Sequence, residues 1–142
     1  MILFEICHAL YKVFAIGTSP DQCQLLDFLS ELGANLQKDG DRVLALMKRV
    51  GRDGAPRNPD ICHQIERKIY QFTQGRIRVL WFYDGGKIVI CTHGFVKKTP
   101  RTPTREINQA KALMKNYFLA KEEGLIKIIP WEEGNPNEKK EL

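Results

Sequence analysis

Residues 68–117 read KIYQFTQGRIRVLWFYDGGKIVICTHGFVKKTPRTPTREINQAKALMKNY, and this stretch decides the fold. Aromatic and β-branched residues dominate 69–72 and 77–83, which predicts two neighbouring strands. The Asp-Gly-Gly turn at 84–86 predicts a hairpin, because glycine supplies the positive φ that such turns require. The almost wholly apolar run 87–92 then predicts a return strand at the centre of the sheet.

Beyond this hairpin the chain becomes basic. We expect it to leave the sheet at 93–95 and to enter residues 97–105, the basic segment, which holds four cations and no acid. A helix is predicted next, with Thr102 as its cap and Pro103 in its first turn. One apolar stripe at helical spacing predicts the face that packs on the sheet: Ile107, Ala110, Leu113, Met114 and Tyr117.

The chain before the hairpin predicts one strand and two helices. Residues 11–17 predict the first strand, and residues 1–10 either extend it or form a separate addition. Ser19 is predicted to cap a helix that Gly33 ends, because a Gln three residues after Ser19 completes a capping box. A second helix is predicted to begin at 36 or 41 and to end at Val50.

These elements predict an α+β protein with a single domain over 1–142. The expected order is β-α-α-β-β-β-α, a small, twisted, mostly antiparallel sheet with a helical hairpin and a C-terminal helix packed on it. Residues 61–66 are expected to form a short helical turn, and the core is expected to span 11–120. The C-terminal extension, 124–142, is predicted to add an edge strand over 125–129 and to become disordered near its end.

Composition narrows the class of protein further. With 142 residues, 43% of them hydrophobic, and no apolar run near ~18 residues, the sequence predicts a soluble cytoplasmic protein without a membrane span or signal peptide. The four cysteines show no C-x-x-C spacing, which is typical of free thiols in a reducing compartment. Adjacent Cys-His pairs such as Cys7-His8 and Cys62-His63 lack the compact spacing of a zinc site, so no metal or cofactor is predicted.

Charge is concentrated in one part of the chain. The net charge is +5, and residues 94–116 alone carry four Lys and two Arg against one Glu. Residues 1–93 carry +2 and residues 117–142 carry −2. This distribution predicts that a polyanion or an acidic partner docks at one place, although a solvated helix face remains the alternative.

Alternation of side chains along a strand 76–83 places Arg76 and Arg78 on one face and predicts a concave cationic site. The alternative is that both arginines simply cap an exposed sheet face. His93 is the best candidate for proton transfer because histidine titrates near neutral pH. It equally well satisfies a backbone carbonyl at the end of a buried strand. For Tyr70 and Tyr83, core packing is favoured over stacking on a base.

The run HGFVKKTPRTPTREINQA, residues 93–110, resembles the C-terminal hallmark of the HigB-like, phage-derived branch of the RelE/ParE toxin superfamily. That branch typically shows a strand, H-G-F-x-K-K, T-P and a helix opening with R/K-E-I. The resemblance is specific from Tyr70 onward. It implies a RelE-like fold and the toxin of a type II toxin–antitoxin system, which cuts mRNA on the ribosome without a metal. Its implied partners are the mRNA, the ribosome and a small helix-turn-helix antitoxin of the HigA type.

The resemblance also implies roles for individual residues. In metal-independent cleavage, the 2′-hydroxyl attacks the adjacent phosphate, so cations must stabilise the pentacovalent state and a group must move protons. Arginine suits the phosphate because its planar fork binds two oxygens. The implied catalytic residues are Arg78, Lys98, Arg101 and His93. The implied substrate-binding residues are Thr73, Arg76, Lys97, Arg105 and Lys111.

One departure from the family pattern leaves other functions open. Relatives often show Y-E-L-R where this chain has Tyr70-Gln71-Phe72-Thr73, so both charges are missing. A second hypothesis is therefore a degenerate domain that binds antitoxin or RNA without cleavage. A third is a ParE-like inhibitor of DNA gyrase that has the same fold and no enzymatic activity.

Overall fold

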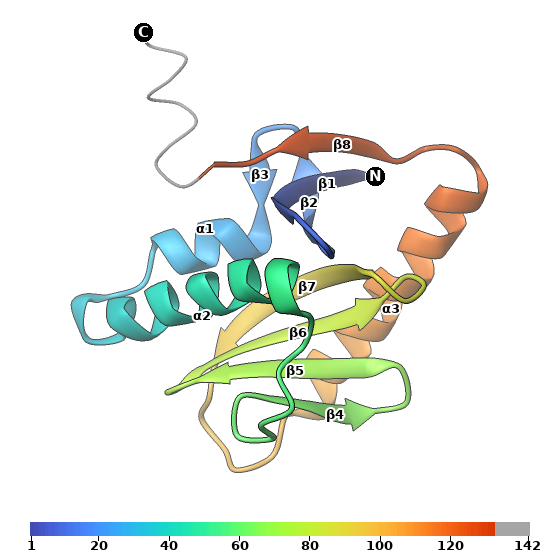
Figure 1. Cartoon of the computed structure of the whole chain (residues 1–142). Coiled ribbons are helices and arrows are strands. Elements are labelled where there is room, and N and C mark those ends of the chain that lie inside the picture. The colour runs from blue at the N-terminus through green and yellow to red at the C-terminus, as the bar shows by residue number, and fades with distance from the viewer. Residues whose placement is uncertain (133–142) are drawn as a thin grey trace, which may run out of the picture.

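The antiparallel strands Ile77–Tyr83 and Ile88–Val96, which are joined by a tight turn, lie at the centre of the fold. The computed structural model describes residues 1–132, and in them one open, twisted sheet carries three helices (Figure 1). The elements in chain order are β1 (Ile2–His8), β2 (Lys12–Ser19), β3 (Gln22–Cys23), α1 (Gln24–Ser30), α2 (Ala34–Asp53), β4 (Cys62–Glu66), β5 (Ile69–Gln74), β6 (Ile77–Tyr83), β7 (Ile88–Val96), α3 (Thr104–Glu122) and β8 (Lys127–Pro130).

The sheet is mixed, with the strand order β4-β5-β6-β7-β2-β1-β8 and β3 paired to β2. The pairs β2/β7 and β1/β8 are parallel, and the other pairs are antiparallel. The predicted α+β class and the central position of β7 are confirmed. The predicted element order is incomplete, because it lacks β1, β3 and β4. The edge strand predicted over 125–129 is present as β8.

Alternating side chains of β6 build two hydrophobic cores, one on each face of the sheet. Val79 and Trp81 pack with residues of α1 and α2, while Leu80 and Phe82 pack with residues of α3. All four side chains are fully buried. Figure 1 shows α1 and α2 in front of the sheet and α3 behind it. A strand that is apolar on both faces is therefore covered by helices on both faces.

Residues 2–8 form strand β1 of the sheet, which corrects the predicted start of the core at residue 11. β1 pairs with β2 on one side and with β8 on the other. The capping box predicted at Ser19 is also wrong. The Ser19 hydroxyl donates to Asp21 Oδ1 at 2.7 Å. Gln22 of β3 pairs with Ser19 of β2, so α1 begins only at Gln24. A local side-chain hydrogen bond has favoured a turn over the helix start.

The second predicted helix is longer than expected and includes two glycines. α2 runs without a break from Ala34 to Asp53, and Gly54, at φ 83°, follows it. Close packing explains why α2 contains Gly51. A Cβ built there would lie 2.2 Å from the Sγ of Cys7 in β1. The contact that demands glycine comes from a strand far away in sequence, so helix propensity alone could not reveal it.

The helical turn predicted over 61–66 is wrong, because Cys62–Glu66 forms strand β4. β4 pairs with β5 along its length, so the backbone hydrogen bonds to β5 decide its conformation. The apolar stripe predicted for the last helix is confirmed, since Ala110 and Tyr117 are buried and the other three members are partly covered. Thr102 is not the cap of that helix, because its hydroxyl bonds to Gln71 instead. The disorder predicted near the C-terminus lies outside the described residues.

Strand β7 continues to Val96, so residues 93–95 stay in the sheet, contrary to the prediction. A register shift makes Thr92 an extra residue in β7, and its hydroxyl donates to the Leu80 carbonyl at 3.1 Å.

No helix among residues 1–132 is long and apolar enough to cross a membrane.

Candidate nucleic-acid interface

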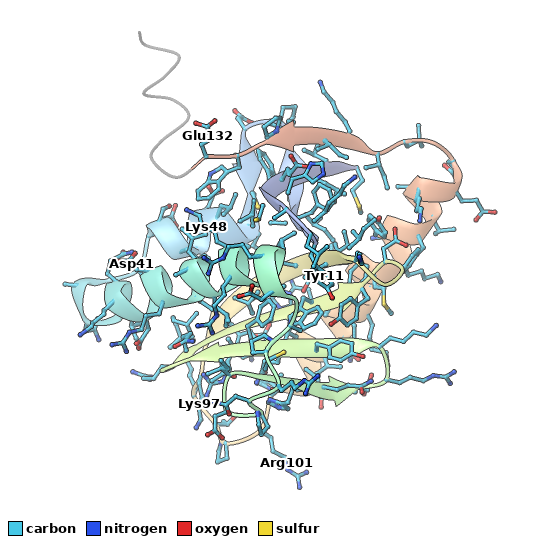
Figure 2. All side chains as sticks on the ribbon, viewed as in Figure 1. Tyr11, Asp41, Lys48, Lys97, Arg101 and Glu132 are labelled. Carbon is cyan, nitrogen blue, oxygen red and sulfur yellow. The ribbon has the colours of Figure 1, made fainter. Side chains whose placement is uncertain are left out.

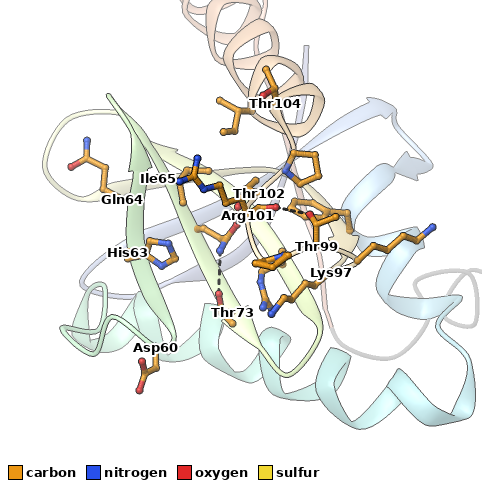
Figure 3. A pocket seen from close by; sticks show the side chains of 17 residues that line it. Asp60, His63, Gln64, Ile65, Thr73, Lys97, Thr99, Arg101, Thr102 and Thr104 are labelled. Carbon is orange, nitrogen blue, oxygen red and sulfur yellow. Dashed lines mark hydrogen bonds between the residues drawn. The ribbon is translucent and has the colours of Figure 1, made fainter.

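A pocket of about 700 Å³ opens where the basic segment passes over the end of the sheet (Figure 3). Its wall includes β4, β5, β6, the end of β7 and the start of α3. This volume lies in the range of ordinary ligand sites. The lining residues are Asp60, His63, Gln64, Ile65, Gln71, Thr73, Arg78, Phe95, Lys97, Lys98, Thr99, Pro100, Arg101, Thr102, Pro103, Thr104 and Ile107.

Arg78 is the cation held most firmly in the pocket. Its Nη1 atom donates to the carbonyls of Gly75 at 2.7 Å and Ile77 at 3.1 Å, so the backbone of the β5–β6 turn orients the guanidinium. Partial burial lowers the pKa of Arg78 from its ordinary value, but arginine stays charged in proteins. The remaining N–H groups of its fork can still meet an anion in the pocket.

The basic segment is tied to the sheet at both of its ends. The Lys97 N–H donates to the Arg76 carbonyl at 2.7 Å, and Arg76 Nη2 donates back to the Lys97 carbonyl at 3.3 Å. At the other end, the Thr102 hydroxyl donates to Gln71 Oε1 at 2.6 Å. Lys98 lies between these anchors with an exposed side chain. The segment therefore presents its cations from a fixed backbone.

Gln71 is a site residue whose role the sequence did not reveal. Its side chain lines the pocket although the residue is only 4% exposed. Its Oε1 accepts from Thr102, and its Nε2 donates to Thr73 Oγ1 at 3.3 Å. The amide therefore links the basic segment to β5. The absence of a charge at residue 71 was visible in the sequence, but the link to Thr102 was not.

Strand β4 adds polar groups that the sequence analysis missed, because it predicted a helical turn there. His63 and Gln64 lie on this edge strand, and both are exposed and line the pocket. His63 is the register partner of Gln71 in β5. Figure 3 shows His63 and Asp60 on one side of the pocket and Lys97 and Thr99 of the basic segment on the other. The residues of β4, CHQIE, do not alternate between apolar and polar, so no local signal marked this strand and only its pairing with β5 reveals it.

The structure brings together five of the nine predicted site residues and leaves four outside the pocket. Those that line it are Thr73, Arg78, Lys97, Lys98 and Arg101. Arg76 lies at the exposed β5–β6 turn, and Arg105 is exposed on the first turn of α3. Lys111 pairs with Glu66 at 2.8 Å, which engages its ammonium in an ion pair across the surface.

His93 is placed in the interior, at 1% exposure. Its Nδ1 lies 3.0 Å from Thr92 Oγ1, and its Nε2 lies 3.3 Å from Glu106 Oε1. Burial lowers the pKa of His93, and the neighbouring Glu106 carboxylate opposes this shift. The geometry fits a histidine that joins β7 to α3, and it gives the ring no contact with the pocket.

The pocket is strongly cationic. Its lining holds one acidic side chain, Asp60, and four cationic side chains: Arg78, Lys97, Lys98 and Arg101. Figure 2 shows Lys97 and Arg101 at the lower edge of the sheet, where their side chains extend outward. A concave surface lined with one sign of charge attracts anionic ligands and favours phosphate.

The fold and the site define a small α+β protein with a cationic pocket at one end of its sheet. The chain belongs to the phage-derived protein Gp49-like family (DUF891), whose model matches residues 27–115. That family is associated with toxins of the RelE/ParE type from toxin–antitoxin systems. The match extends from α1 into α3 and includes the whole pocket, whereas β1, β2, β3 and β8 lie outside it. No curated protein matches the chain.

Proposed function

We propose that this chain is a HigB-like toxin of a type II toxin–antitoxin pair that cuts mRNA on the ribosome. The observation that carries the proposal is the pocket, where Arg78 of β6 and three cations of the basic segment surround one hollow. Three of these four cations are among the residues that the family resemblance implies for catalysis: Arg78, Lys98 and Arg101. A small helix-turn-helix antitoxin of the HigA type is the proposed partner, and the cytoplasm is the proposed site of action.

In the proposed reaction the scissile phosphate lies in the pocket against Arg78. The guanidinium is held by two backbone carbonyls, so it needs little reorganisation when negative charge develops on the phosphate. Lys98 and Arg101 add charge from the basic segment. The 2′-hydroxyl attacks the phosphorus, the 5′-oxygen leaves, and a 2′,3′-cyclic phosphate forms. This chemistry needs a proton acceptor and a proton donor but no cofactor.

His63 replaces His93 as the proposed proton-transfer group. His63 is exposed and lines the pocket, while His93 is buried and bonded to Thr92 and Glu106. A general acid or base must come within hydrogen-bond reach of the substrate, and of these two histidines it is His63 that lines the pocket. Histidine also has the ordinary pKa best suited to proton transfer near neutral pH.

A binding-only domain is the second candidate, favoured by one observation. Gln71 donates to Thr73 and accepts from Thr102, so neutral residues join β5 to the basic segment where the family pattern has charged residues. This neutral link keeps the pocket intact without supplying a charge of its own. Such a protein would bind ribosomes or antitoxin and leave mRNA uncut.

Primer extension on mRNA from a translating extract tests the proposal. We expect new 5′ ends that require both translation and the parent protein. Arg78→Lys keeps the charge but loses the fork, and Lys98→Ala removes an exposed cation without a role in the fold. Both variants should lose cleavage by about 10²-fold or more, whereas the control Lys115→Ala on α3 should cut like the parent.

Parent protein that produces no new ends would refute the ribonuclease. Binding to ribosomes without cleavage would then support the binding-only domain, and inhibition of DNA gyrase by the purified protein would support a ParE-like inhibitor. Cleavage by Arg78→Lys and Lys98→Ala at the parent's rate would refute the assignment of the site.

A further inference from the structure

A second cationic surface lies on α2, outside the pocket described above. Three arginines of this helix line a groove of about 360 Å³, together with Gln74 at the end of β5. Arg42, Arg49 and Arg52 are all exposed. None of the residues that line this groove is acidic, and Ala45 lies between the arginines as a short side chain that leaves the groove open.

The three arginines form one stripe on the helix. At 3.6 residues per turn, positions 42, 49 and 52 lie on the same side, and at 1.5 Å per residue they span about 15 Å. The opposite side of α2 is core, with Val43 and Met47 fully buried. A stripe of this length matches about four phosphates of one nucleic-acid strand at ~3.4 Å per phosphate.

Local stabilisation does not explain the stripe. A cation in the last turn of a helix interacts favourably with the helix dipole, which accounts for Arg52 but not for Arg42 or Arg49. Arg42 lies 3.8 Å from Asp39, a long pair whose arginine side chain is 56% exposed. Such a contact contributes little to stability. All three residues are arginine, the side chain best suited to bind phosphate oxygens in pairs.

The stripe is connected to the pocket around the end of the sheet. Thr73 lines the pocket and the next residue, Gln74, lines the groove, because neighbouring side chains of a strand point to opposite faces. Arg76 is exposed at the β5–β6 turn between the two surfaces. Figure 1 shows this turn beside the N-terminal half of α2.

We propose that the α2 stripe binds backbone phosphates of an RNA strand that continues from the pocket across the β5–β6 turn. This inference rests on the proposed function for the identity of the polyanion. The stripe adds length and affinity to RNA binding and takes no part in bond cleavage. Its contacts are to phosphates, so they are independent of base sequence.

Binding of uncleavable 2′-O-methyl RNA of two lengths tests the stripe. An oligonucleotide of about 4 nucleotides fills only the pocket, while one of about 20 nucleotides reaches both surfaces. The test variant is Arg42→Ala/Arg49→Ala/Arg52→Ala. The control, Arg67→Ala/Lys87→Ala/Lys115→Ala, removes the same charge from exposed positions elsewhere. Circular dichroism confirms that both variants fold.

The test variant should lose affinity for the long RNA and bind the short RNA like the control. For single strands, each lost phosphate contact reduces the slope of log affinity against log salt by about 0.7, so the slope should fall by about 2. Over a fourfold rise in salt, the parent should therefore lose roughly 15- to 20-fold more affinity than the variant. Equal affinity and slope for variant and control would overturn the inference and point to carboxylates of an acidic protein as the partner of the stripe.

The proposed function and this inference fail separately. A parent that cleaves mRNA in the translating extract, with a stripe variant that binds long RNA like the control, refutes only the stripe. A parent whose affinity for long RNA depends on the stripe, but which leaves mRNA uncut, refutes only the ribonuclease.

Discussion

Replacing Gln71 tests how the basic segment is held over the sheet. The Gln71 side chain is almost fully covered and makes two hydrogen bonds: its Oε1 accepts from Thr102 at 2.6 Å, and its Nε2 donates to Thr73 at 3.3 Å. The first bond is short and contributes about 1–1.5 kcal/mol, while the second is long and contributes about 0.5 kcal/mol. Gln71→Ala should therefore lower the free energy of unfolding by about 2 kcal/mol once the small cavity is included.

A double-mutant cycle separates the bond to Thr102 from the other effects. Thr102→Val removes the hydroxyl and keeps the shape of the side chain. Urea unfolding of both single variants and the double variant should give a coupling free energy of about 1 kcal/mol. Ribonuclease activity should fall in all three variants, because the cations of the basic segment lose their fixed position. The control, Asn108→Ala, changes an exposed polar side chain of α3 that does not line the pocket.

A coupling free energy below about 0.3 kcal/mol would refute the reasoning, because residues without a shared interaction give additive effects. Full activity in the Gln71→Ala variant would show that the position of the basic segment does not depend on this amide. It would also show that a neutral residue at position 71 is not needed to hold the basic segment over the sheet.

Two further predictions concern proton transfer and pH. His63→Gln should lower the rate of single-turnover cleavage by about 10²- to 10⁴-fold. Its affinity for uncleavable RNA, measured by RNA binding, should stay within twofold of the parent's. An unchanged cleavage rate would exclude His63 as a proton donor or acceptor. Asp84 accepts bonds from Tyr117 and Lys121, and these bonds outweigh its burial, which by itself raises the pKa, so the pKa of Asp84 lies below its ordinary value. Because the pKa of Asp84 is lower in the folded than in the unfolded protein, where it is near ~3.9, the carboxylate contributes stability above that pH, and this stability is lost as the pH falls through the folded-state pKa. The urea midpoint of the parent should therefore drop more in that acid range than the midpoint of Asp84→Asn. Equal drops would contradict the assignment.

The central hairpin and the last helix could be predicted from the sequence because their signals are local. β6 was predicted at its observed bounds, since its residues strongly favour strands and a glycine turn follows it. The apolar stripe of α3 was likewise visible as periodicity. The concentration of charge in the basic segment was present in the sequence as well, and it identified three residues that line the pocket, Lys97, Lys98 and Arg101.

Only the tertiary structure decided which of these residues share a site. β4 is a strand because β5 lies beside it, and that pairing brings His63 to the pocket. The extra residue at Thr92 keeps His93 in the sheet, where α3 covers it. Sequence patterns record the preference of each segment for helix or strand and for burial of one face. They carry no information about hydrogen bonds between distant segments, and those bonds determine which side chains meet.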